Sequence, residues 1–173
     1  MSEGQFFGKF RATVINNIDP EMRGRLMLMI PDVSSLIPST WAEACVPLAG
    51  PTGPPMGVFM VPPIGAGVWV EFENGDPNYP VWVGCRWGAS SDIPSMATAG
   101  LPISPNIIIQ SLLQNMIMIS DLPGPTGGIT LQSTTGASII VNDTGIYIQN
   151  GKGASINMVG PTVTINESAL TIT

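Results

Sequence analysis

Apolar and polar residues alternate over short segments along most of the chain, which is the period of a β-strand with one buried face. In the first half, turn residues separate five such segments, and this spacing is typical of a small all-β barrel. The expected strands cover residues 10–15, 25–30, 41–46, 68–72 and 81–84. Asn74-Gly75 favours a tight hairpin between the last two, because both residues tolerate a positive φ.

The second half repeats short strands, with Gly, Asn or Asp turns between most of them. Seven strands are expected, at 116–119, 129–131, 138–142, 146–149, 155–158, 163–166 and 170–173. One face of these strands is aliphatic and is formed by Ile117, Ile119, Ile129, Leu131, Ile139, Val141, Ile146, Ile148, Ile156, Met158, Val163, Ile165, Leu170 and Ile172. A single thin layer of strands cannot bury this face, so the pattern predicts several identical chains around one axis, which also pairs exposed strand edges.

The segment between the two halves, residues 89–105, is rich in Ala, Ser, Pro and Met and shows no period. We therefore divide the chain into a first domain at 1–88, a linker at 89–105 and a strand-repeat domain at 106–173. A second tract rich in Gly and Pro, residues 50–57, predicts a constrained loop inside the first domain.

The composition supports association between chains. Hydrophobic residues make up 44% of the chain and charged residues only 10%, against roughly 25% charged in an average soluble domain. The uncharged stretch 93–120 contains three prolines, which prevent a membrane-spanning helix. The N-terminus has no basic segment followed by an apolar one, so assembly in the cytoplasm is expected. Burial between subunits of a homo-oligomer remains as the way to remove this apolar surface from water.

The charge pattern excludes several functions. The net charge is -6 and both halves are acidic, so nucleic acid, whose binding depends on phosphate neutralisation, is not an expected partner. The chain has no His, and a Ser-His-Asp triad is therefore absent. Glu71, Glu73 and Asp76 are interpreted as exposed strand and turn residues rather than a catalytic pair. We expect no enzymatic activity, cofactor or metal site.

The sulfur-containing residues are also given structural interpretations. Met27-Leu28-Met29 and Met116-Ile117-Met118 place Met at alternate strand positions, which is typical of core or interface packing rather than metal binding. Cys45 and Cys85 each lie in an apolar segment and are expected as two buried, reduced thiols, with a disulfide as the alternative.

One pattern of glycines and prolines in the first half is specific enough to suggest a family. Its residues are Gly57, Phe59, Pro62, Gly65, Val68, Val70, Phe72, Gly75, Asp76, Pro77, Pro80 and Gly84, preceded by Gly24-Arg25, Ile30-Pro31-Asp32 and Trp41-Ala42. This pattern resembles the OB-fold domain of the central spike proteins of contractile phage tails and related injection systems, which include baseplate assembly protein V and VgrG-like spikes.

The second half is similar to the trimeric β-helix of the same family. Between Asp121 and Asn142 an Asp, a Gly-rich turn, Ile-Thr-Leu and a Thr-Gly turn follow one another as they do there. The resemblance implies an all-β chain, with a small OB-fold barrel followed by a short intertwined triangular trimeric β-helix. The aliphatic face defined above would then form the interior of the trimer.

The resemblance also implies a function and partners. It implies a structural, membrane-piercing central spike at the baseplate of a phage or phage-like particle, joined to a hub protein, expelled with the tail tube and in transient contact with a target membrane. The chain shows no hub-like domain, no lysozyme insertion and no His-x-His iron ligands. Hub and tip are therefore expected to be separate proteins, with a PAAR-like tip docking at Leu170, Thr171, Ile172 and Thr173.

Two other functions remain open at this point. A trimeric adhesin or receptor-binding tail fibre would use the same strand repeat but add a binding head. Clustered exposed aromatic residues would favour such a head, and the second half has only Tyr147. A wall-degrading enzyme is disfavoured by the missing His and the missing carboxylate pair.

Overall fold

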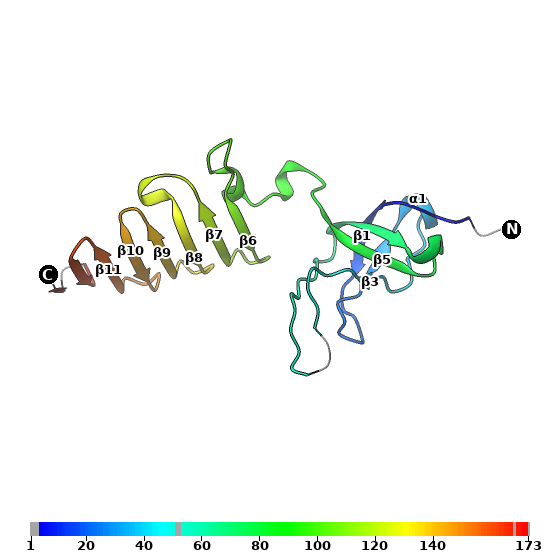
Figure 1. Cartoon of the computed structure of the whole chain (residues 1–173), viewed down its shortest axis with the longest axis horizontal. Coiled ribbons are helices and arrows are strands. Elements are labelled where there is room, and N and C mark those ends of the chain that lie inside the picture. The colour runs from blue at the N-terminus through cyan, green and yellow to red at the C-terminus, as the bar shows by residue number, and fades with distance from the viewer. Residues whose placement is uncertain (1–3, 51–52, 168, 173) are drawn as a thin grey trace. The chain divides into compact units, whose positions relative to one another are not determined.

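The computed structural model describes residues 4–50, 53–167 and 169–172, and its regular structure is almost entirely β. The chain divides into two compact units, Met1–Ser90 and Ser91–Thr173, each with its own sheet (Figure 1). In the part of the chain that is described, no helix has the length and apolar character needed to cross a membrane.

The first unit is built on a five-stranded sheet in the order β2-β1-β4-β5-β3. Its strands are β1 (Phe10–Asn16), β2 (Met27–Met29), β3 (Glu43–Ala44), β4 (Gly67–Phe72) and β5 (Pro80–Arg86). β3 pairs parallel with β5, and the other pairs are antiparallel. The helix α1 (Pro31–Ser34) follows β2, and the short 3-10 helix η1 (Glu73–Gly75) turns the chain from β4 into β5.

This sheet closes on itself. Leu26 and Ala42, which directly precede β2 and β3, exchange two backbone hydrogen bonds with N···O distances of 3.1 and 2.7 Å. These bonds join the two ends of the strand order. Register shifts in β1 and between β4 and β5 mark bulges, which increase the local bend of a strand. The predicted small barrel is confirmed.

The barrel core comes from the inward positions of the alternating strands. In β4, Val68, Val70 and Phe72 are buried, whereas Trp69 and Glu71 between them are partly exposed. The core consists of Ala12, Val14, Leu26, Leu28, Ile30, Ala42, Val68, Val70, Phe72 and Trp82. A barrel of this size therefore buries its apolar residues within one chain.

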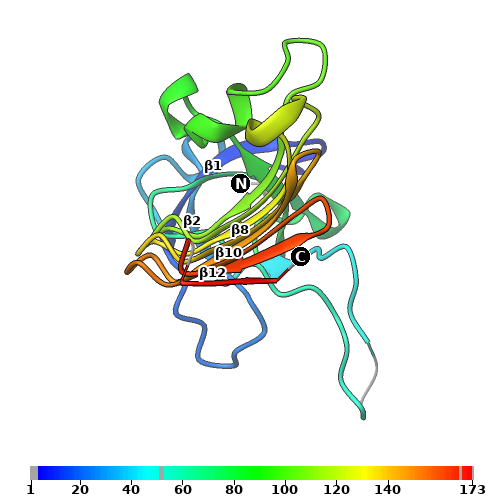
Figure 2. The same cartoon turned by 90° about the vertical axis from the view of Figure 1, so that its left-hand side faces the viewer.

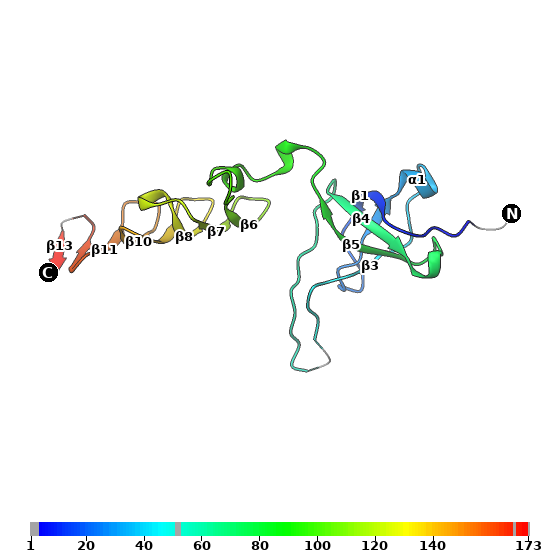
Figure 3. The same cartoon turned by 45° about the horizontal axis from the view of Figure 1, so that its top comes forward.

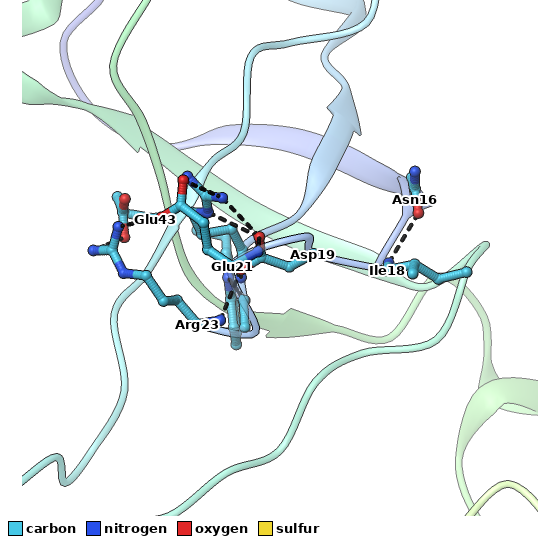
Figure 4. A network of polar contacts seen from close by, with 9 residues as sticks. Asn16, Ile18, Asp19, Glu21, Arg23 and Glu43 are labelled. Carbon is cyan, nitrogen blue, oxygen red and sulfur yellow. Dashed lines mark hydrogen bonds and ion pairs between the residues drawn. The ribbon is translucent and has the colours of Figure 1, made fainter.

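The turn between β1 and β2 is organised around one buried carboxylate (Figure 4). Asp19 accepts hydrogen bonds from the backbone N–H groups of Glu21, Arg23 and Arg25 and from the guanidinium of Arg25, whose Nη2 lies 2.7 Å from Oδ1. The Arg25 side chain and these N–H groups hold the pKa of Asp19 well below its usual value of 3.8. Trp82 adds a link from the core, because its Nε1 donates to the carbonyl of Gly24 over 3.0 Å.

Three expectations for the first unit need correction. The strand expected at 41–46 is only Glu43–Ala44, because the chain then leaves the sheet toward the Pro-rich loop. Cys45 and Cys85 are free thiols, but the prediction that they are buried is wrong. Cys45 follows the last residue of β3, and Cys85 lies near the end of β5, where it pairs with Val68 of β4. Glu73 belongs to η1 and not to the strand.

The loop between β3 and β4 extends away from the barrel (Figure 3). Among its described residues, 45–50 and 53–66, Ala49 and Gly57 form an isolated bridge, and the Gly50 N–H donates to the Met56 carbonyl over 2.7 Å. Met56, Phe59 and Met60 on this loop are all largely exposed.

The second unit is an eight-stranded antiparallel sheet in which each strand pairs with its neighbours in sequence. Its strands are β6 (Ile107–Gln110), β7 (Met116–Ser120), β8 (Gly128–Gln132), β9 (Ser138–Asn142), β10 (Gly145–Gln149), β11 (Ser155–Val159), β12 (Thr162–Ile165) and β13 (Leu170–Ile172). Figure 2 views this stack along its row of strands, which turn gradually from one to the next.

The residues expected as a linker pack on this sheet. They include the 3-10 helices η2 (Ser90–Asp92) and η3 (Ser95–Thr98). Asn106 donates through Nδ2 to the carbonyl of Met96 over 2.7 Å, and its backbone N–H donates to the carbonyl of Ala97 over 3.1 Å. Residues 91–105 therefore belong with the second unit.

Candidate functional site

Two continuous rows of aliphatic side chains run along one face of the second sheet. The pairing register places in the first row Ile107, Ile119, Ile129, Val141, Ile146, Met158, Val163 and Ile172. The second row contains Ile109, Ile117, Leu131, Ile139, Ile148, Ile156, Ile165 and Leu170. We call them the 107–172 row and the 109–170 row. Neither row contains a polar residue, and both cross all eight strands.

Both rows are open to solvent in the single chain. Ile107 is 66% exposed, Ile129 49% and Ile172 56%, and most other members are exposed to a similar degree. An exposed apolar surface of this continuity marks an interaction site in a soluble protein. The face therefore requires a partner that removes it from water.

The opposite face is covered by the chain itself over its first strands. Met118 and Thr130 point to this face and are only 4% and 6% exposed. Asn106 contacts the Met118 sulfur through Nδ2 at 3.5 Å, which brings the segment preceding β6 onto this side. The described residues thus cover part of one face of the sheet and leave most of the aliphatic face exposed.

Side-chain hydrogen bonds in the turns fix the register on which the rows depend. In the turn after β9, the Asn142 Oδ1 accepts from the backbone N–H groups of Thr144 and Gly145. In the turn after β10, the Asn150 Oδ1 accepts from Lys152 and Ala154 in the same way. A shift of one residue in the strand pairing would move aliphatic side chains to the other face. These turns therefore keep the two rows on one face.

Gly128 shows how closely the backbone is packed at the start of β8. Its φ is +86°, and a Cβ at this position would lie 2.0 Å from the carbonyl oxygen of Val141. A side chain here is excluded by both the backbone conformation and the neighbouring strand.

Two shallow grooves lie along the 109–170 row. The first, of about 540 Å³, is lined by row members from β6 to β10, including Ile117, Leu131 and Ile139. The second, of about 560 Å³, continues to β12 through Ile148, Ile156 and Ile165. The row is therefore recessed along most of its length and offers a long apolar concavity.

All fourteen aliphatic positions singled out in the sequence lie in these two rows. The sequence interpretation missed Ile107 and Ile109, which begin the rows on β6. The run Ile107-Ile108-Ile109 shows no alternation, so its strand character becomes visible only through its pairing with β7. Of the residues expected to hold a tip, Leu170 and Ile172 are about half exposed on β13, and Thr173 lies outside the described residues.

The glycine and proline pattern of the first half shapes the barrel. Val68, Val70, Phe72, Pro62 and Pro80 are buried, and Phe59 is 72% exposed. Gly65 and Gly75 lie in turns, with φ of +89° and +77°. Gly84 lies at the bulged end of β5, and Gly57 forms the isolated bridge with Ala49. Asp76 accepts the backbone N–H of Asn78 over 2.9 Å, and Pro77 follows it in the turn.

The acidic residues singled out in the sequence have structural partners. Among the described residues, no group of three or more His, Cys, Asp or Glu side chains is placed to hold a metal ion. Glu71 pairs with Lys9 over 2.5 Å, and Asp76 is used in its own turn.

Two family models match the chain, one on each unit. Residues 10–87 match the type VI secretion system/phage-baseplate injector OB domain. Residues 106–171 match the phage baseplate V C-terminal trimerisation domain. No curated protein matches the chain. The second match covers every member of both aliphatic rows except Ile172, and its description as a trimerisation domain supports a homotrimer.

Proposed function

The chain belongs to the phage baseplate V family of injector spike proteins, and on this basis we propose that its homotrimer is the rigid, membrane-piercing central spike of a contractile injection system. Both families are structural baseplate domains rather than enzymes. The piercing role and the links to hub and tip are our proposal.

One observation carries it: most members of the two aliphatic rows are exposed, while the chain covers part of the other face. Three copies that place these rows around one axis bury them together. The axis must run along the rows, because only then are both rows buried over their full length. The fourteen predicted interior residues, with Ile107 and Ile109, would line this axis.

Such a trimer suits axial load. Its interior would be dry and aliphatic, and interiors packed to the density of organic crystals resist compression. The strands of the second unit contain no charged residue. Asp121, Asp143, Lys152 and Glu167 all lie outside them. An uncharged sheet surface lowers the desolvation cost of entering a lipid bilayer.

The first test introduces a charge into the interior. Ile156→Asp would place three carboxylates around the axis, where unpaired buried charges cost several kcal/mol each. The matched control is Asn157→Asp, which adds the same charge at the next residue, on the other face of β11. Light scattering should give three times 18.2 kDa, or 54.6 kDa, for the wild type and the control. Ile156→Asp should give the monomer mass, and a normal trimer from this variant contradicts the interior assignment.

The second test addresses piercing. Contractile particles assembled with the Asn157→Asp spike should release dye from lipid vesicles when the sheath contracts. Particles made with Ile156→Asp should lack the spike and release none. Equal release from particles that lack the spike would show that the chain does not pierce the membrane.

For the tip, we propose that a separate PAAR-like protein docks on β13. This strand is paired only with β12 in the described sheet and exposes Leu170 and Ile172. A free strand edge and apolar side chains together suit a protein partner. Co-expression should recover a PAAR-like protein with the full chain but not with a variant that lacks residues 170–173. Equal recovery with both would place the tip elsewhere.

A further inference from the structure

Two groups of exposed apolar residues flank β6, at opposite ends of this one strand. Leu112 and Leu113, in the turn after β6, are 82% and 71% exposed. Ile103, shortly before β6, is 95% exposed, and Ile107 at its start is 66% exposed. Neither group is covered by its own chain.

Both groups are held in place by polar contacts. In the turn after β6, the Ser111 Oγ accepts the backbone N–H of Asn115 over 3.1 Å, and the Thr134 hydroxyl donates to the carbonyl of Leu113. Ile103 lies in a closed turn in which the Ser104 N–H donates to the Leu101 carbonyl over 3.0 Å.

The Ile103 turn is also anchored to the neighbouring loop. The Ser104 hydroxyl donates to the carboxylate of Asp121 over 2.5 Å. Fixed turns that present large apolar side chains lose little conformational entropy on binding. The two groups are therefore preorganised for a contact.

The antiparallel order places these groups on the two opposite sides of the sheet where the turns lie, which we call its edges. One edge carries the turns at 111–115, 133–137 and 150–154, and we call it the 111 edge. The other carries the turns at 121–127, 143–144 and 160–161, and we call it the 121 edge. Leu112 and Leu113 lie on the 111 edge. Ile103 lies beside the 121 edge, because Ser104 bonds Asp121 there.

Rotation about an axis along the rows leaves every strand at its own level. Three sheets around such an axis bring the 111 edge of one copy to the 121 edge of the next, in a head-to-tail contact that closes after three copies. At the level of β6, the groups that meet are Leu112 and Leu113 of one copy and Ile103 of its neighbour. We infer that these residues form an intersubunit clasp at the first strand of the trimer.

The clasp rests on the proposed arrangement of the trimer but adds to it. The aliphatic rows bury the centre of the assembly, whereas the clasp would fix the three sheets to one another at the corners. The occupant of each exposed group is a second copy of this chain, since both groups adjoin the face that the trimerisation domain provides.

A disulfide tests this contact directly. In a chain carrying Cys45→Ser and Cys85→Ser, the pair Ile103→Cys and Leu113→Cys is oxidised with copper phenanthroline. Within one chain the four residues of β6 separate these positions by more than about 10 Å, beyond the ~7 Å between Cα atoms that a disulfide spans. Any bond must therefore join two copies. We expect a covalent trimer on a non-reducing denaturing gel, and only monomers from each single-Cys variant.

The matched control moves one partner along the same edge. Thr144 lies on the 121 edge in the turn after β9, three strands from β6 and so about 14 Å away along the stack. Leu113→Cys with Thr144→Cys should give no covalent trimer. If light scattering finds the 54.6 kDa trimer but the Ile103 pair forms no bond, or no more than the control, the clasp is wrong and the spike proposal stands. If no trimer forms even in the wild type, the proposed function fails and the clasp with it.

A second measurement asks whether the clasp adds stability. Leu112→Ser with Leu113→Ser should lower the temperature at which the trimer dissociates in detergent. Leu36→Ser with Ile37→Ser removes an equally exposed apolar pair, 85% and 70%, from the barrel and should leave that temperature unchanged. Equal effects from both pairs would also overturn the clasp.

Discussion

The two units of this chain satisfy the same hydrophobic requirement in different ways. The barrel closes on itself and leaves Leu26, Leu28, Val68 and Val70 with no exposed surface. The second sheet has a longer apolar face and exposes it on seven of its eight strands, with the positions on β12 partly covered. The difference lies in topology: a barrel has an inside, whereas a single layer of strands gains one only when further layers join it. Alternation alone therefore indicates that a face is buried, not whether one chain buries it.

The largest effect that tests this contrast is expected when one leucine in each unit is truncated to alanine. Leu28→Ala should lower the free energy of unfolding of the barrel by about 3 kcal/mol, because it leaves a cavity in a sealed core. The loss of stability caused by Leu28→Ala should not depend on protein concentration. Leu131→Ala should act mainly through the trimer, because the 41% of Leu131 that is exposed in a single chain becomes buried only on association.

Calorimetry at two protein concentrations tenfold apart separates these effects. The barrel transition should stay in place, and the transition of the second unit should rise with concentration, as mass action requires for an oligomer. A barrel transition that shifts with concentration would show that the first unit also depends on association.

A smaller effect, the pH dependence of stability, should also distinguish the two units. Because the pKa of Asp19 is lowered in the folded barrel, its contribution to stability is fully present above its unfolded pKa of about 3.8 and is lost as the pH falls toward the folded pKa. Urea unfolding at pH 6, 4, 3 and 2 should show the barrel weakening over the acid end of this range. Asp19→Asn should flatten that dependence, whereas Asp76→Asn, in an exposed turn, should retain it. An unchanged acid dependence in Asp19→Asn would assign the effect to other carboxylates.

The smallest effect is expected at the surface of the barrel. Lys9 and Glu71 form an ion pair at 2.5 Å, but their side chains remain 58% and 41% exposed. Exposed pairs of this kind contribute about 0.5 kcal/mol or less. Lys9→Ala should therefore change the barrel transition hardly at all, and a loss above about 1 kcal/mol would mean that the pair is more than a surface contact.

Much of this architecture could be predicted from the sequence, and the failures have physical causes. The barrel strands at β1, β4 and β5 were found because one buried face leaves a clear alternation, and the turn at Asn74-Gly75 has the positive φ values expected there, 53° and 77°. The strand β6 was missed because an unbroken Ile run has no period. The exposure of Cys45 and Cys85 depends on their positions at the ends of β3 and β5, which composition does not show.

The candidate site was predictable in its members but not in its arrangement. Each aliphatic position could be found within its own strand. Their alignment into two rows depends on the pairing register, which is set by turn lengths and by side chains such as Asn142 and Asn150. The clasp residues Ile103, Leu112 and Leu113 lie outside the alternation, and only the fold shows that they flank the same strand.

In the second sheet each strand pairs with its neighbours in sequence, which makes the length of the stack adjustable in units of two strands. Each added pair of strands would lengthen the stack by about 9.6 Å and return the chain to the same edge, with the aliphatic side still facing the same way. A single added strand would reverse the chain direction for everything that follows. Removal of β9 and β10 together, with the turn after them (residues 138–154), should therefore give a shorter rod with both rows intact, so that reach can be altered in steps without redesigning the interior.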